Sequence, residues 1–88
     1  MRPETDIYAE ALQRWGLKSQ LGLLAEECGE LIAMINRWQR GRTGEDSVAI
    51  EAADVEIMLG QLRLIMGSQI DAAKRLKLAR LEKRLEVR

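Results

Sequence analysis

The sequence predicts an all-α protein, a small bundle of four helices that forms a single domain over residues 1–88. Apolar residues recur at alternating spacings of three and four, whereas no useful run alternates apolar and polar residues with a period of two. Glycines and capping residues divide the chain into segments of helical length. With 88 residues, 47% of them hydrophobic, the chain can form one modest core and hardly two.

The first half of the chain contains two predicted helices. Pro3 suits the first turn of a helix that runs to about residue 14, where Trp15 and Gly16 interrupt it, because glycine readily ends a helix. The second helix is expected over residues 19–39, which carry one clear apolar face. That face consists of Leu21, Leu24, Cys28, Leu31, Ile35 and Trp38.

The stretch "RGRTGED" predicts a short connection over about residues 40–45. It contains two glycines, and Thr43 with Asp46 three residues later is typical of a helix start. A third helix is therefore expected over residues 46–66. Its short connection to the second helix makes the two an antiparallel hairpin.

The last segment is predicted to be a separate, basic helix. Gly67 is expected to stop the third helix, and Ser68 with Asp71 forms a capping box for the fourth. Residues 72–88 carry seven basic and two acidic side chains, whereas residues 1–71 carry seven basic and twelve acidic ones. The plainer interpretation is a solvated helix packed against an acidic body, and a nucleic-acid or membrane tail is the alternative.

Composition favours a soluble, cytoplasmic protein. Cys28 is the single cysteine, so no intrachain disulfide is possible, and it fits best as a small buried hydrophobe. No apolar stretch approaches the roughly 20 residues that span a bilayer, and no targeting segment is evident. Fourteen basic and fourteen acidic side chains balance, so the whole chain gives no reason to expect a polyanion as partner.

Two of the predicted helices each carry two carboxylates on their apolar side. On a helical wheel of about 100° per residue, Glu27 falls within the apolar arc of the second helix and Glu30 at its border. Glu51 falls within the apolar arc of the third helix, with Asp54 beside it. Burying an unpaired carboxylate costs several kcal/mol, so these acids need arginine or lysine from another helix, shared protons or a divalent cation.

The antiparallel hairpin predicts that the four acids converge. Residues at the same level of antiparallel helices have a constant sum of residue numbers, and this sum is the same for Glu27 with Asp54 as for Glu30 with Glu51. It centres the turn between residues 40 and 41, within one helical turn of the expected loop. Oxygen ligands without histidine favour hard ions, Mg²⁺ or Mn²⁺, over zinc.

The segments "EECGE" at 26–30 and "EAAD" at 51–54 resemble the EExxE and ExxD motifs of the MazG-like, all-α nucleoside triphosphate pyrophosphohydrolases, a superfamily that includes the dimeric dUTPases. The segment "WGLKSQLGLLAEECGEL" is similar to the opening of the metal-binding helix in these proteins. The resemblance covers roughly residues 15–58 well and the ends of the chain loosely.

The resemblance implies Mg²⁺-dependent cleavage between the α and β phosphates of a nucleoside triphosphate, giving the monophosphate and pyrophosphate. The biological role is then housecleaning of damaged nucleotides or control of a normal pool. Glu26 would be an outer ligand or would orient the attacking water, and Glu27 would act in catalysis through the metal. The metal ligands by motif position are Glu27, Glu30, Glu51 and Asp54.

Contacts to the triphosphate and the base are expected from other segments. The last helix loosely resembles the basic helix that follows ExxD in such enzymes, and its candidates for phosphate binding are Lys74, Lys77 and Arg80. The alternative candidates lie in the loop between the second and third helices and are Arg37, Arg40 and Arg42. Trp15, at a helix end, is expected to stack on the base, whereas Trp38 fits better as a core residue. The nearby amides are Gln20 and Asn36.

A homodimer or tetramer is expected, because the apolar surface of the third helix is too wide for one hairpin to cover, and sites of this superfamily are commonly completed by a neighbouring subunit. The main alternative is a non-catalytic helical oligomerisation or adaptor module whose acids pair with the basic helix across a subunit boundary. Nucleic-acid binding through residues 74–84 is the weakest possibility, because that stretch lacks aromatic residues.

Overall fold

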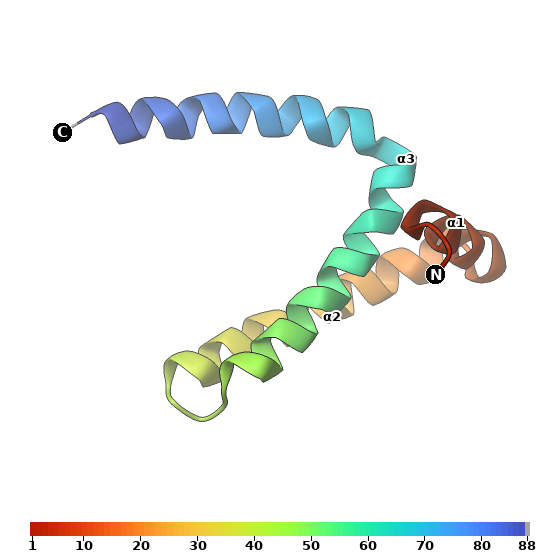
Figure 1. Cartoon of the computed structure of the whole chain (residues 1–88), viewed down its shortest axis with the longest axis horizontal. Coiled ribbons are helices and arrows are strands. Elements are labelled where there is room, and N and C mark those ends of the chain that lie inside the picture. The colour runs from red at the N-terminus through yellow and green to blue at the C-terminus, as the bar shows by residue number, and fades with distance from the viewer. Residues whose placement is uncertain (88) are drawn as a thin grey trace.

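The computed structural model describes residues 1–87, and within them the chain forms three α-helices and no strand. Helix α1 spans Glu4–Trp15, α2 spans Leu17–Gln39 and α3 spans Glu45–Glu86. Helix α2 and the first part of α3 form an antiparallel hairpin, and α1 packs against both at the end far from the turn (Figure 1). The predicted all-α class is confirmed, whereas the predicted number of four helices is not.

The junction between α1 and α2 lies where the sequence predicts it. Helix α1 ends at Trp15, and the backbone N–H of Gly16 donates to the carbonyl oxygen of Leu12 over 2.9 Å. Gly16 has a φ of 86°, a conformation that a residue with a side chain rarely adopts. The chain then turns directly into α2, which begins at Leu17, two residues before the expected start.

The hairpin turn is also close to its predicted place, between the end of α2 and the start of α3. Gly41 has a φ of 71° there, and its N–H donates to the carbonyl oxygen of Trp38 over 2.9 Å. The expected capping by Thr43 and Asp46 is wrong. Gly44 occupies the N-cap position of α3, and no side chain caps the helix there.

Helix α3 bends at Met66 but does not end there. Met66 has non-helical angles, φ −137° and ψ 34°, and helical structure resumes at once. The predicted fourth helix is therefore the second part of α3, here called the arm (residues 67–87). The predicted capping box of Ser68 and Asp71 does not start a new helix here. The carboxylate of Asp71 instead accepts a hydrogen bond from the guanidinium of Arg63. This contact lowers the pKa of Asp71 below its ordinary value of 3.8.

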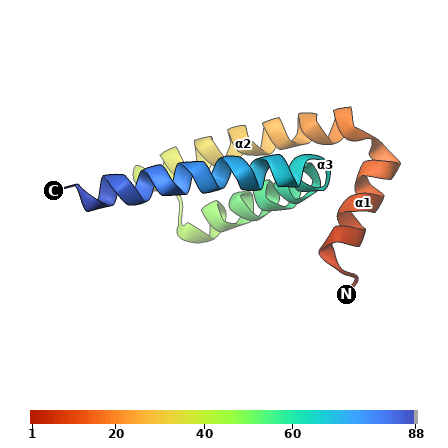
Figure 2. The ribbon, with the colours of Figure 1, turned by 90° about the horizontal axis from the view of Figure 1, so that it is seen from above.

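The Arg63–Asp71 pair bridges the bend. Eight residues of straight helix span roughly 12 Å, too far for easy contact, so the bend brings the two side chains together. Seen from above, the arm runs back in the same general direction as the hairpin (Figure 2). Seen from the side, the arm and the hairpin move apart as they leave the bend (Figure 1). Every residue from Asp71 to Val87 is exposed. The expectation that this helix packs against its own acidic body is thus wrong within one chain.

The core of the single chain is small. Its buried hydrophobic residues are Val55 and Met58, each 9% exposed. Two amide side chains, Gln20 and Gln61, are also buried and are each 4% exposed. Large side chains expected to pack are instead exposed, Trp38 at 43% among them, because one hairpin covers only one side of each helix. The others on the predicted apolar face of the second helix are Leu21 and Ile35. Cys28 is half-buried.

Helix α1 approaches α3 closely at Gly60. A Cβ atom placed on Gly60 would lie 2.8 Å from Cζ of Tyr8 and closer still to Cε2. The hydroxyl of Tyr8 donates to Glu4 over 3.1 Å, which fixes the ring on the same helix. Gly60 therefore provides the space in which α1 docks. No helix within residues 1–87 is both long enough and apolar enough to cross a bilayer.

Candidate metal centre

Three carboxylates from α2 and α3 come together on the inner side of the hairpin. Glu27, Glu51 and Asp54 each offer one oxygen, and these three oxygens lie within 4.8 Å of one another. All three side chains are half-buried. Glu51 and Asp54 are three residues apart, hence on one face of α3, and the antiparallel register places Glu27 of α2 opposite them. The predicted convergence is present for these three acids.

Two oxygens of this cluster are buried without a hydrogen-bond partner. Oε2 of Glu27 and Oε2 of Glu51 have no partner within residues 1–87. A buried carboxylate oxygen without a donor is costly, because the hydration that it loses is not replaced. The cluster therefore needs a proton or a cation.

The pKa values of two acids are raised by this arrangement. Burial raises the pKa of Glu27 from 4.5 to about 6, and the negative charges of Glu30, Asp54 and Glu51 add to the effect. Burial also raises the pKa of Glu51, and the negative charges of Glu30 and Asp54 act in the same direction. The neighbours that perturb both groups are all acids, so no base within the described chain neutralises the cluster.

Glu30 belongs to the cluster through its charge, while Glu26 does not. Glu30 is exposed at the edge of the hairpin, yet its carboxylate acts on both Glu27 and Glu51. Glu26 is exposed and lies outside the three-carboxylate group. Its role as an outer ligand or in orienting the attacking water stays a prediction.

The donor set fits a hard divalent cation. It consists of carboxylate oxygens alone, which suit Mg²⁺ and Mn²⁺, and it lacks the nitrogen or sulfur that zinc sites usually include. The two unpartnered buried oxygens, one from each helix, are the atoms that such an ion would satisfy first. Glu27, Glu51 and Asp54 would hold it, with Glu30 at the exposed side.

The raised pKa values predict how stability depends on pH in the absence of metal. An acid whose pKa is higher in the folded state adds stability below its unfolded value and loses this contribution as the pH rises through the folded value. In chelator, the melting temperature is therefore expected to rise as the pH falls from about 7 to about 5. Glu27→Gln should flatten this part of the profile. A melting temperature that instead falls over this interval contradicts the assignment.

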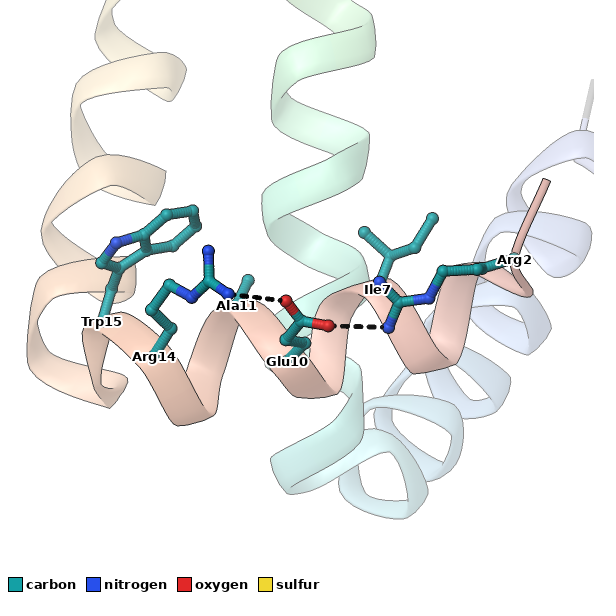
Figure 3. A pocket seen from close by; sticks show the side chains of 6 residues that line it. All are labelled: Arg2, Ile7, Glu10, Ala11, Arg14 and Trp15. Carbon is teal, nitrogen blue, oxygen red and sulfur yellow. Dashed lines mark hydrogen bonds and ion pairs between the residues drawn. The ribbon is translucent and has the colours of Figure 1, made fainter.

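Trp15 lies away from the carboxylates, at the end of α1. It is 59% exposed and lines a small pocket of about 120 Å³ together with Ile7 and Ala11 (Figure 3). Glu10, which also lines this pocket, forms ion pairs with Arg2 over 2.9 Å and with Arg14 over 3.1 Å. The indole is thus accessible as a stacking surface, but the fold of one chain does not place it beside the acids.

The two predicted amides lie on either side of the cluster. Gln20 is seven residues before Glu27, roughly 10 Å along α2, and is 4% exposed within the helix interface. Asn36 is exposed nearer the turn. The single chain does not bring these amides together, and their role as base contacts stays a prediction.

Gln61 is a buried polar residue that the motif analysis missed. Its Nε2 donates to Sδ of Met58 over 3.7 Å, while its Oε1 is buried without a partner in the described chain. The register that aligns Glu27 with Asp54 also aligns Gln20 with Gln61. The rule that residues at the same level of the hairpin have a constant sum therefore identifies Gln61 from the sequence, as the residue opposite Gln20.

The candidate phosphate-binding bases are all exposed. Lys74, Lys77 and Arg80 lie on the arm, beyond the bend at Met66. None of them is among the groups that shift the pKa values of the carboxylates. The rivals Arg37, Arg40 and Arg42 are at the hairpin turn and are also exposed.

Comparison of this chain with known proteins gives no significant match to a family model, to a curated protein or to a solved structure.

Proposed function

We propose that this protein is a Mg²⁺-dependent nucleoside triphosphate pyrophosphohydrolase of the MazG-like type, with Mn²⁺ as a possible substitute for Mg²⁺. It cleaves the bond between the α and β phosphates and releases a nucleoside monophosphate and pyrophosphate. The observation that carries the proposal is the group of carboxylates from two antiparallel helices, with two buried oxygens that lack a partner. The resemblance of the segments that carry these acids to the EExxE and ExxD motifs supports the proposal.

The residues take distinct roles in this proposal. Glu27, Glu51 and Asp54 hold the ion, and Glu30 completes the set from the exposed edge. A bound divalent cation would neutralise negative charge on the triphosphate and would make the attacking water more acidic. Glu26, exposed beside this group, orients the attacking water. Glu27 has a dual role as ligand and catalytic residue, because it acts on the reaction through the metal that it holds.

The remaining contacts follow from the chemistry of a triphosphate. Lys74, Lys77 and Arg80 supply positive charge for the phosphates, and Trp15 supplies a stacking surface for the base. Because one chain leaves these groups apart from the carboxylates, a homodimer or tetramer assembles the full site. The protein works in the cytoplasm, and its role is control or housecleaning of nucleotide pools.

The proposal is tested by pyrophosphate release from a panel of standard and modified nucleoside triphosphates. Release is expected with Mg²⁺ or Mn²⁺ and not in chelator, and the preferred base should emerge from the panel. Added metal should also raise the melting temperature, because an ion that binds only the folded state stabilises it. No release from any nucleotide together with no thermal shift would overturn the proposal.

A non-catalytic assembly module is the second candidate. It is favoured by the many exposed apolar side chains and by an arm that carries most of the basic charge of the second half. A module held by pairs of acids and bases loses nothing in chelator, whereas a metal site does. Thermal melting with and without Mg²⁺ therefore separates the two candidates without any assay of activity.

A further inference from the structure

We infer that a hollow on α1 recognises guanine, so that the substrate of the proposed function is a guanine nucleoside triphosphate. The inference rests on the proposed function, to which it adds the identity of the base. The hollow is the pocket of about 120 Å³ beside Trp15 (Figure 3). None of the three clustered carboxylates lines it, so the assembly proposed above is what joins the base to the triphosphate site.

An apolar row along α1 lines one side of the hollow. Ile7, Ala11 and Trp15 follow one another at a spacing of four residues and therefore lie on the same side of the helix. Ala11 is small, and it leaves a gap between the larger side chains of Ile7 and Trp15 (Figure 3). The indole of Trp15 is 59% exposed at one end of this gap. A flat ring is the group that such a surface takes best.

A charged row runs beside the apolar one. Glu10 lies between two arginines (Figure 3), and it forms ion pairs through Oε1 with Arg2 over 2.9 Å and through Oε2 with Arg14 over 3.1 Å. Each carboxylate oxygen accepts up to two hydrogen bonds, so one ion pair on each leaves a second position for a ligand. The side chain of Glu10 is 45% exposed, which keeps these positions accessible. The charged row therefore presents a donor, two acceptors and a donor, in this order.

Guanine is the base whose edge complements this order. Its N1–H and its 2-amino group are adjacent donors, and the acceptors O6 and N3 flank them. Adenine and cytosine each have one amino group next to an acceptor nitrogen, and uracil has one N–H between two carbonyl oxygens. Each of these bases would turn an acceptor toward a carboxylate oxygen of Glu10, which repels it. A carboxylate with an arginine on either side thus selects guanine.

The same groups disfavour an isolated phosphate as the occupant. The two arginines outnumber Glu10, but its carboxylate lies between the guanidinium groups and repels an anion. A neutral base leaves both ion pairs in place. The volume of about 120 Å³ corresponds to about four molecules of liquid water, so the hollow takes the edge of a base and leaves the sugar and phosphates outside.

The first experiment measures which base enters the hollow. The 5′-monophosphates of guanosine, inosine, adenosine, cytidine and uridine are titrated in chelator, and the indole N–H signals of Trp15 and Trp38 are followed by NMR. Guanosine monophosphate is expected to shift the signal of Trp15 and to leave that of Trp38 in place. The inosine compound lacks only the 2-amino group, and the loss of one hydrogen bond to a carboxylate should weaken its binding about tenfold or more. Equal binding of all five nucleotides, or no shift by the guanine compound, overturns the inference.

The second experiment tests Glu10 with two matched variants. Glu10→Gln keeps the shape of the side chain but replaces one acceptor by a donor. Asp6→Asn makes the same change on the same helix, at an exposed residue outside the hollow. Asp6→Asn should bind guanosine monophosphate as the wild type does, whereas Glu10→Gln should bind it about tenfold more weakly and lose the preference over the inosine compound. Both variants should stay folded by circular dichroism, because the ion pairs of Glu10 are exposed. Unchanged binding by Glu10→Gln overturns the inference.

Hydrolysis separates this inference from the proposed function. With Mg²⁺, pyrophosphate release from GTP and dGTP is expected at a kcat/KM about tenfold or more above that of the other triphosphates. Release from every triphosphate without this preference overturns the inference and leaves the proposed function standing. Binding of guanosine monophosphate that depends on Glu10, without release from any triphosphate, overturns the proposed function and with it the guanine triphosphate as substrate.

Discussion

Glu51→Gln is expected to abolish pyrophosphate release while the protein stays folded. The substitution removes one negative charge from the carboxylate cluster while nearly preserving the size of the side chain. A catalytic metal contributes several kcal/mol of transition-state stabilisation, and each 1.4 kcal/mol is tenfold in rate. A loss of at least about 100-fold in kcat/KM is therefore expected. In chelator the melting temperature should be unchanged or higher, because an unpaired buried carboxylate has been removed.

The matched control is Glu56→Gln on the same helix. Glu56 is exposed and lies outside the three-carboxylate group, so the same chemical change there should leave pyrophosphate release near the wild-type rate. Thermal melting with Mg²⁺ adds a readout independent of turnover. Stabilisation by the metal should persist in Glu56→Gln and weaken in Glu51→Gln. Wild-type activity in Glu51→Gln would remove the carboxylate cluster from the mechanism.

Gly60→Ala is expected to destabilise the protein by loosening α1. The new methyl group would overlap the ring of Tyr8, and overpacking of this kind costs about 1–3 kcal/mol. In a helix interior alanine gains about 1 kcal/mol over glycine, so only part of this cost is offset. For a domain of this size a net loss of about 1 kcal/mol lowers the melting temperature by roughly 4–8 °C.

Gly22→Ala provides the control for Gly60→Ala. Gly22 lies within α2, and a Cβ atom there meets nothing within 4 Å. This variant should therefore show only the stabilisation that alanine gives over glycine within a helix, and it should melt at a higher temperature than the wild type. Combining Gly60→Ala with Tyr8→Ala should remove most of the penalty, since the clash needs both side chains. If Gly60→Ala melts as high as Gly22→Ala, then α1 does not dock through Gly60.

The hairpin and its acids could be predicted from the sequence because they depend on local rules. The turn follows from its two glycines, of which Gly41 has a positive φ, and the level of each residue follows from helix geometry once the turn is known. The position of Glu27 opposite Asp54 needs no further information. Glu30 was placed with the inner acids, whereas its side chain is exposed, because a small rotation about the helix axis separates border residues from buried ones.

The arm could not be predicted in the same way. Gly67 and the Ser68–Asp71 pair are typical of a helix end, but a helix that bends keeps nearly all of its backbone hydrogen bonds. The interruption at Met66 therefore lies where the sequence predicts it, but it is a bend and not a separate helix end. The direction of the arm depends on the Arg63–Asp71 contact, which joins residues that helical periodicity does not pair. The expected burial of Trp38 was wrong for the related reason that periodicity identifies an apolar face but not what covers it.

Under the proposed function, the raised pKa of Glu27 makes protons and cations compete for the carboxylate cluster. Near pH 6 this carboxyl holds a proton about half of the time when no cation is bound. A cation that binds there must displace the proton, so its apparent affinity falls as the medium becomes more acidic, and binding releases acid into the solution. Under the proposed function, a modest acidification of the surroundings would therefore weaken the binding of the cation to the cluster.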